Sequence, residues 1–223
     1  MSHFACVEDF SRQDSAKQQI KVLESAQKIF KKENINIKYH IAASAASLLL
    51  PKSHFDMIRV GISLYGFWPS LTTKTSYESN ISTKTPLTPA LSWKTKIASL
   101  RKISPGQAVG YGHTFTASSH MQIAVLPVGY FEGYPRLAGS DKQAHVLIKG
   151  QTCSIVGRIC MNMMMVDVSK ISNPTVGEVV TLIGKDKKEE ITAEQIAQWA
   201  QTIQYEIVSK LNPKIPRILV RKK

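Results

Sequence analysis

The sequence lacks the features that mark secreted, metal-binding and membrane-spanning proteins. Its three cysteines form no Cys-x-x-Cys pair, and an odd number of cysteines without a secretory leader favours a reducing compartment over a disulfide scaffold. The His and Cys spacings of zinc sites are absent, so no metal is expected. No apolar run approaches the ~18 residues that span a bilayer, and Met1 is followed by Ser-His-Phe-Ala rather than a basic leader. We therefore expect a cytoplasmic protein without a membrane partner.

Acidic residues are also scarce relative to basic ones. The chain has 29 Lys and Arg against 16 Asp and Glu, a formal net charge of +13. Such an excess raises affinity for phosphates, nucleic acid or acidic membranes. The charges are scattered, however, and short clusters such as Lys185–Lys188 and Arg221–Lys223 lack the interleaved aromatics of a single-strand binding groove. A nucleic-acid partner is therefore not favoured.

The first 80 residues carry a repeating strand and helix pattern. Short apolar runs at Met1–Cys6, Ile35–Ala42 and Phe55–Gly66 indicate strands. After the first run, apolar side chains recur at spacings of three and four, which predicts an amphipathic helix, and Ser44 begins another. This order predicts parallel βα units, but three parallel strands would expose apolar edges. Because a closed barrel needs eight strands and ~250 residues, we interpret residues 1–80 as the last strands of a truncated (β/α)8 barrel.

The rest of the chain favours β-structure. Residues 68–88 are rich in Ser, Thr, Lys, Asn and Pro, which predicts a linker. Residues 81–223 then form a predicted β-rich domain, with strands at Leu91–Ile97, Met121–Val128, His145–Ile148, Cys153–Val156, Met163–Val168 and Glu178–Ile183. One helix is expected at Ala193–Ala200, capped by Thr192. The expected fold class is α/β plus β: a partial (β/α)8 barrel followed by an all-β C-terminal domain with one helix.

Tyr111 lies between Gly110 and Gly112 in the segment Val109–Thr114. A phenol titrates near ~10 in water, so a tyrosine that removes a proton at neutral pH needs nearby cations or hydrogen bonds to its phenolate. Flanking glycines would let a flat ligand approach the backbone closely. The alternative is a tyrosine that packs between the glycine turns of a β domain.

Arg59 is the second candidate. It precedes Gly66, at the end of the third predicted strand, and the C-terminal mouth of a barrel is where active sites and phosphate cups lie. His40, at the end of the preceding strand, could orient this arginine, and Ser44 at a helix start could help to hold a phosphate. The alternatives are an arginine salt-bridged inside the barrel wall and a histidine satisfied in the core.

A methionine-rich stretch, Val156–Asp167, carries four methionines within five positions. Such clusters most often fill a core with soft side chains. Cys160 has no histidine beside it in sequence that would indicate a Cys/His pair. The stretch by itself therefore predicts packing rather than chemistry.

Taken together, these stretches resemble the pyridoxal-phosphate-dependent alanine racemases over nearly the whole chain. The resembling segments are Met1–Ala5, His40–Ser44, Phe55–Gly66 with Pro69–Ser70, Val109–Thr116, Leu126–Gly133, Gly157–Asn162, and Ile203–Val208 with Ile215–Arg217. The resemblance implies a (β/α)8 barrel followed by a β-rich domain. It also implies dimers in which the barrel of one subunit pairs with the β domain of the other.

The resemblance assigns roles around the cofactor ring. Tyr111 resembles the catalytic tyrosine, which takes the α-proton from one face of the cofactor-bound substrate. Arg59 resembles the arginine that faces the pyridine nitrogen, where a cation keeps that nitrogen unprotonated and limits the cofactor as an electron sink. His40 would hold that arginine, and His3 would belong to the surrounding polar network.

The resemblance also implies phosphate and substrate contacts. The cofactor phosphate would be held by Ser44, the backbone of Gly61 and Ile62, and Tyr205. The substrate, alanine, would be met by the backbone N–H of Met161 at its carboxylate, and by Tyr130 and Arg136 at the entryway.

The sequence departs from the family pattern at three places. Ala43 stands where many members carry asparagine, and Asn162 where many carry aspartate; backbone groups can still serve the phosphate and the carboxylate there. The third departure is larger, because the family's Schiff-base lysine lies in a Lys-Ala-x-Ala-Tyr-Gly-His segment that is absent here. Racemisation in this family needs that lysine to hold the cofactor and to act as the base on the opposite face.

Three functions therefore stay open. The first is an isomerase, alanine racemase, that feeds D-alanine to peptidoglycan synthesis, as a homodimer or with a partner chain that carries the N-terminal half. The second is a remnant that retains only a binding or dimerisation role. The third is a basic nucleic-acid-binding protein, which predicts steeply salt-dependent affinity.

Overall fold

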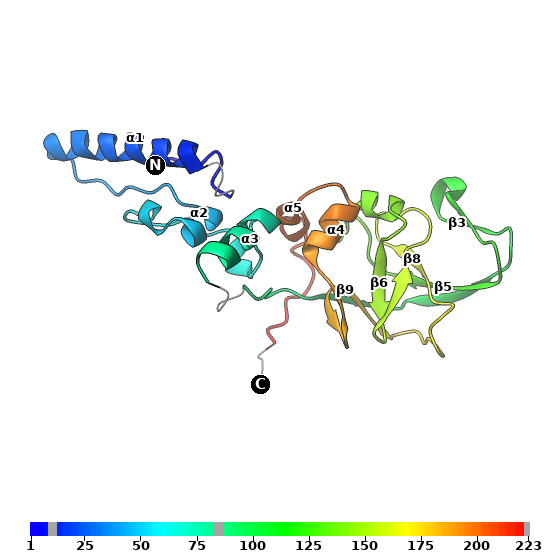
Figure 1. Ribbon diagram of the computed structural model, residues 1–223. Coiled ribbons are helices and arrows are strands. Elements are labelled where there is room, and N and C mark those ends of the chain that lie inside the picture. The colour runs from blue at the N-terminus through cyan, green and yellow to red at the C-terminus, as the bar shows by residue number, and fades with distance from the viewer. Residues whose placement is uncertain (9–12, 83–86, 221–223) are drawn as a thin grey trace. The chain divides into compact units, whose positions relative to one another are not determined.

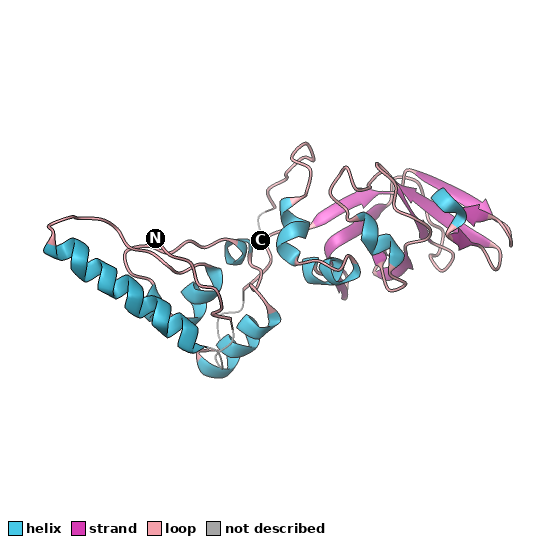
Figure 2. Ribbon diagram, turned by 90° about the horizontal axis from the view of Figure 1, so that it is seen from above, coloured by secondary structure: helices cyan, strands magenta, loops and turns pink. Residues whose placement is uncertain are grey.

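The computed structural model describes residues 1–8, 13–82 and 87–220 and divides into two compact units, Met1–Ala90 and Leu91–Lys223 (Figure 1). This division lies at residue 90, whereas the sequence placed it at residue 80. Ala90 contacts the first unit, where its N–H donates to the Tyr65 carbonyl at 3.0 Å. Helices and loops make up the first unit, and the strands lie in the second (Figure 2).

Helices dominate the first unit. Its elements are α1 (Gln13–Lys32), α2 (Ser44–Leu49), α3 (Leu71–Asn80) and the short 3₁₀ helices η2 (Pro51–Ser53) and η3 (Ile62–Tyr65). The helix predicted from spacings of three and four is α1, which buries Ala16 and Leu23. These side chains join Phe4, Tyr39 and Ile41 in the core of the unit.

The three strands predicted in the first unit are not regular strands in the described residues, so that prediction is wrong. The segments lie side by side but share few backbone hydrogen bonds. Ser2 N–H donates to His40 O, and Asp56 N–H and Arg59 N–H donate to Tyr39 O and Ala42 O. One isolated parallel bridge joins Ala43 and Arg59. A parallel ladder gains its bonds from neighbours on both sides, and these segments lack enough of them to form a sheet.

The predicted linker contains helix α3, so that prediction is also wrong where the structure describes it; residues 83–86 lie outside the described residues. The Ser70 side chain caps the helix by accepting from the Thr73 N–H at 3.0 Å. Thr73 itself is fully buried. Serine and threonine serve caps as readily as loops, which is why composition alone missed the helix.

Antiparallel sheets make up most of the second unit. The five-stranded sheet contains β1 (Trp93–Lys96), β9 (Val179–Asp186), β6 (His145–Ile148) and β7 (Gln151–Ser154), with β10 (Glu189–Ile191) paired to β9. The three-stranded sheet has the order β2 (Ser99–Ile103), β5 (Met121–Leu126) and β8 (Met164–Asp167), and a hairpin joins β3 (Ala108–Val109) to β4 (Phe115–Thr116). Strands β5, β6, β8 and β9 supply fully buried core side chains: Leu126, Leu147, Met164 and Leu182.

Each of the six predicted strands overlaps one of these, whereas β2, β3, β4 and β10 were not predicted. Strand β2 has no fully buried side chain, so its sequence shows no clear alternation.

Two α-helices, not the single predicted one, lie in the described part of the second unit. The predicted helix is α4 (Ala193–Trp199), and its cap at Thr192 is confirmed: Thr192 Oγ1 accepts from the Gln195 N–H, and the Gln195 side chain accepts from the Thr192 N–H. The second is α5 (Gln204–Ser209), which spans six residues. Six residues are too few for a helical period to show in sequence. None of the helices in the described residues is long and apolar enough to cross a bilayer.

Candidate active site

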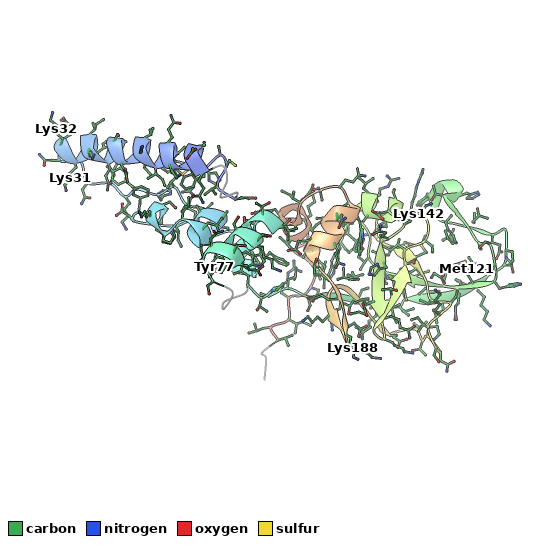
Figure 3. All side chains as sticks on the ribbon, viewed as in Figure 1. Lys31, Lys32, Tyr77, Met121, Lys142 and Lys188 are labelled. Atoms are coloured by element: carbon green, nitrogen blue, oxygen red, sulfur yellow. The ribbon has the colours of Figure 1, made fainter. Side chains whose placement is uncertain are left out.

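The predicted site residues fall into two sets, one in each unit. The first unit carries His3, His40, Ser44, Arg59, Gly61 and Ile62; the second carries Tyr111, Tyr130, Arg136, Met161 and Tyr205. Figure 3 shows Lys31 and Lys32 at the end of α1 in the first unit, and Lys142 and Lys188 in the second unit.

Arg59 lies at the centre of a polar cluster in the first unit. One guanidinium nitrogen lies 2.5 Å from His40 Nδ1, and the other lies 2.9 Å from His3 Nδ1 and 3.0 Å from the Ser2 carbonyl oxygen. A guanidinium only donates hydrogen bonds, so both imidazoles accept at Nδ1 and are neutral, with the proton on Nε2. Arg59 makes no ion pair with any described carboxylate. Its positive charge is therefore oriented but not neutralised.

The protonation of His40 follows from the same contacts. Burial, the Arg59 charge and the N-terminal ammonium all lower the pKa of His40 below its ordinary value of 6.5, with burial the largest cause. A neutral His40 can accept from Arg59, whereas a protonated one would repel it. The cluster therefore keeps its geometry near neutral pH.

Hydroxyl and backbone N–H groups converge around Ser44, the first residue of α2. Ser44 Oγ accepts from the Gly61 N–H at 2.9 Å and lies 3.5 Å from the Ser63 nitrogen. The buried Ser63 hydroxyl has no hydrogen-bond partner among the described residues, and the same holds for the Ile62 N–H. A small group of hydroxyls and backbone amides, one of them unpaired among the described residues, suits phosphate oxygens. The residues present therefore fit the phosphate of the implied cofactor.

Tyr111 begins the short helix η4 (Tyr111–His113) and is 73% exposed. Gly110 and Gly112 both have positive φ, at 78° and 72°. A Cβ on Gly112 would lie 2.9 Å from Arg158 Nη1, and a Cβ on Gly110 would lie 3.3 Å from the backbone nitrogen of Arg158. The flanking glycines thus allow the tyrosine turn to pack on Arg158.

Arg158 is a residue that the sequence reasoning did not assign to the site. A tyrosine that accepts a proton needs a cation nearby, and this guanidinium packs on the Tyr111 turn. The available signal was its place in the segment Gly157–Asn162, which carries the family resemblance.

Met161 lies on the turn that precedes β8, and its backbone N–H has no acceptor among the described residues. The same turn receives two backbone hydrogen bonds: the Tyr130 N–H donates to Cys160 O at 3.1 Å, and the Phe131 N–H donates to Met161 O at 2.9 Å. The structure therefore brings Tyr130 and Met161 together. The neighbouring Met164 is fully buried, so part of the methionine cluster does fill the core.

A cavity of about 270 Å³ lies between the loop that carries Tyr130 and Arg136 and helix α5. Glu206 on α5 accepts hydrogen bonds from Lys210 and Thr202, and the Lys210 contact is the main cause of the lowered pKa of this glutamate. Tyr205 is the preceding residue and is 38% exposed. Tyr130 and Arg136 thus line a cavity beside the helix that carries Tyr205, all within the second unit.

The chain matches two family models, one for each part. Residues 1–69 match the alanine racemase N-terminal domain, and residues 90–219 match the alanine racemase C-terminal domain. The alanine racemase of Leptospira interrogans is 40% identical over 220 residues, which cover 98% of this chain and 56% of that protein. The alanine racemase of Halothermothrix orenii is 38% identical over 223 residues, with coverages of 97% and 55%.

Solved structures show the same similarity. The alanine racemase of Bacillus anthracis with bound L-Ala-P aligns with a TM-score of 0.85 and 30% identity, covering 98% of this chain and 54% of that one. The alanine racemase of the D-cycloserine producer Streptomyces lavendulae aligns with a TM-score of 0.84 and 32% identity, with coverages of 99% and 56%. The chain thus spans about half the length of the relatives it matches. The two domain models, the relative at 40% identity and the structural similarity all agree. The chain therefore belongs to the alanine racemase family.

Proposed function

We propose that this chain serves in an alanine racemase, a pyridoxal-phosphate-dependent isomerase that interconverts L- and D-alanine. The family membership supports the activity, and the donor set around Ser44 and Arg59 supports the cofactor. We place the enzyme in the cytoplasm, where D-alanine would feed peptidoglycan synthesis. These 223 residues do not contain the family's lysine-bearing segment. A lysine to hold the cofactor and to act as the base on the opposite face would therefore come from another polypeptide segment.

Within this proposal, residues of the first unit hold and tune the cofactor. Pyridoxal phosphate supplies the electron sink that makes the α-proton of an amino acid removable. Ser44, Gly61 and Ile62 would offer a hydroxyl and backbone amides to the phosphate. The resemblance also assigns Tyr205 to the phosphate. Arg59 presents an unneutralised cation to the pyridine nitrogen, and neutral His40 and His3 orient it.

Residues of the second unit handle the substrate. The Tyr111 phenol oxygen would accept or supply the α-proton on one face, while the lysine of the other segment would supply or accept it on the opposite face. The free N–H of Met161 binds the carboxylate, and Tyr130 and Arg136 line the approach. The observation that carries the proposal is the Arg59 cluster, because a guanidinium held by two neutral imidazoles and no described carboxylate suits an unprotonated pyridine nitrogen.

The test combines the chain with the segment that it lacks. The full chain would be mixed with pyridoxal phosphate, alone and together with a polypeptide that carries the lysine-bearing half of a related alanine racemase. We expect cofactor absorbance and D-alanine formation from the mixture, and little racemisation from either part alone. Tyr111→Phe should abolish turnover but retain cofactor binding. Arg101→Lys, at an exposed position of β2, should change neither turnover nor cofactor binding. A mixture that assembles but neither binds the cofactor nor racemises alanine would contradict the proposal.

A binding or dimerisation role is the second candidate, and one observation favours it. The first unit exposes several large apolar side chains, among them Ile29, Ile37, Met57, Ile58 and Leu64. If these side chains form one contiguous patch, it would mark an interaction surface, which a second copy or the lysine-bearing half would cover. Sedimentation of the full chain with and without that half discriminates the two: self-association without cofactor binding favours a dimerisation module.

A further inference from the structure

The loop after β5 and the turn before β8 pair through their backbones although neither is a strand. Two N–H groups of the loop, from Tyr130 and Phe131, donate to carbonyls of the turn. Gly129 makes this approach possible, because a Cβ there would lie 2.1 Å from Cys160 O. The loop and the Met161 turn are therefore one packed structure, and whatever holds the loop also orients the Met161 N–H.

Glu132 joins the two segments through its side chain. One carboxylate oxygen accepts from the Gly129 N–H at 2.8 Å, and the other accepts from the Asn162 side-chain amide at 3.0 Å. Hydrogen bonds to a carboxylate are about twice as strong as neutral ones. Glu132 makes no ion pair with any described cation. Its charge is thus stabilised by the two segments that it joins.

The backbone of the same residue reaches a third segment. The Asn212 N–H donates to Glu132 O at 3.2 Å, and the Asn212 side chain donates to Phe131 O at 3.0 Å. Asn212 follows α5, the helix that carries Tyr205, and Gly133 packs closely on the Lys210 carbonyl. Glu132 therefore connects the turn of Met161 with the chain that leaves α5.

We propose that Glu132 is a positioning residue, which orients the Met161 N–H by pairing its carboxylate with the Asn162 amide. The pairing needs a side-chain donor at position 162, which the Asn162 amide supplies. A carboxylate there would face the Glu132 carboxylate and repel it. The inference rests on the proposed function only for its last step, the binding of a substrate carboxylate by Met161.

Exchanging the donor and the acceptor tests the pairing. Asn162→Asp places two carboxylates face to face. Glu132→Gln combined with Asn162→Asp restores a donor and an acceptor with exchanged roles, and the introduced glutamine can still accept from the Gly129 N–H. In the full chain, we expect Asn162→Asp to raise hydrogen exchange of amides 129–134 by about tenfold, and the double variant to return it to near wild type. Glu132→Gln alone should have little effect, because the Asn162 amide can turn to accept.

Asn173→Asp is the matched control, since it adds the same charge at an exposed position of the same unit. Unchanged exchange in Asn162→Asp relative to this control would overturn the pairing. Faster hydrogen exchange in Asn162→Asp that the double variant does not reverse would also overturn the pairing. It would show that the aspartate disturbs the turn by itself, whatever residue stands at position 132.

Acetate, a bare carboxylate, probes the consequence for the site. In the wild-type chain, the NMR chemical shift of the ¹⁵N-labelled Met161 amide should change during an acetate titration. The change should be smaller in Asn162→Asp and should return to the wild-type size in the double variant. An equal shift in all variants would overturn the positioning role of Glu132. No shift in the wild type would instead overturn the proposed carboxylate contact of Met161, while hydrogen exchange still decides the pairing.

Discussion

The two units hold their candidate site residues by different means. In the first unit, side chains hold side chains: Arg59 contacts His40 and His3, which are 19 and 56 residues away in sequence. In the second unit, backbone packs on backbone at several places, and the approach depends on glycines such as Gly129 and Gly133. The first arrangement depends on protonation and donor geometry, the second on the absence of Cβ atoms. The two units should therefore fail under different perturbations.

The largest effect is expected from Gly129→Ala. Its Cβ would meet backbone atoms of Cys160 and Met161 at 2.1–2.5 Å, so one of the paired segments must move. We expect a loss of about 3 kcal/mol or more in the free energy of unfolding, measured by urea denaturation. Gly106→Ala is the control, because its φ is +86° but nothing lies within 4 Å; strain alone costs about 1 kcal/mol. Equal losses would show that close backbone packing does not support the second unit.

Arg59→Lys breaks the side-chain cluster of the first unit. A lysine ammonium cannot span the two imidazoles and the Ser2 carbonyl that the planar guanidinium reaches. We expect a loss of about 1–3 kcal/mol in the free energy of unfolding, against a change within about 0.5 kcal/mol for exposed Arg101→Lys. Unfolding free energies of the two variants within error of each other would refute the role of the cluster in stability.

Acid should destabilise the first unit through His40. Because the pKa of His40 in the folded chain is lowered below 6.5, the unfolded chain binds the proton more readily. The contribution of neutral His40 to the free energy of unfolding is fully present above pH 6.5. It is lost as the pH falls through the lower pKa that His40 has in the folded chain. Thermal midpoints from about pH 7 to about pH 5 should fall more for the wild type than for His40→Gln, which does not titrate. If the thermal midpoints of the wild type and His40→Gln fall equally with pH, His40 is not the cause of the acid sensitivity.

The smallest effect is expected from Tyr134→Phe in the second unit. The Tyr134 ring is fully buried near Trp93, with centroids 5.9 Å apart, and its hydroxyl has no partner among the described residues. Burial raises the pKa of this phenol far above its usual range. Deleting an unpaired buried hydroxyl should change the free energy of unfolding by less than about 1 kcal/mol, or increase it. A larger loss in urea denaturation would reveal a partner for the hydroxyl.

Local patterns predicted the elements whose signals are local. The spacing of apolar residues revealed α1, and the Thr192–Gln195 capping box located the start of α4. The same reasoning placed strands in the first unit where the chain forms no ladder and, at Ile62–Tyr65, a 3₁₀ helix. A parallel strand depends on neighbours that no local pattern supplies. It also missed α3, whose Ser and Thr residues are typical of loops.

The sequence by itself determined the family, the order of the two parts and the residues that carry the resemblance, because motifs and hydrophobic periods are properties of neighbouring residues. Only the tertiary structure decided that Arg59 meets two neutral histidines, that Arg158 lies beside the Tyr111 turn, and that Glu132 pairs with Asn162. These contacts join residues far apart in the sequence, or depend on which turn packs on which. Such contacts follow from the packing of whole segments, which adjacent residues do not encode.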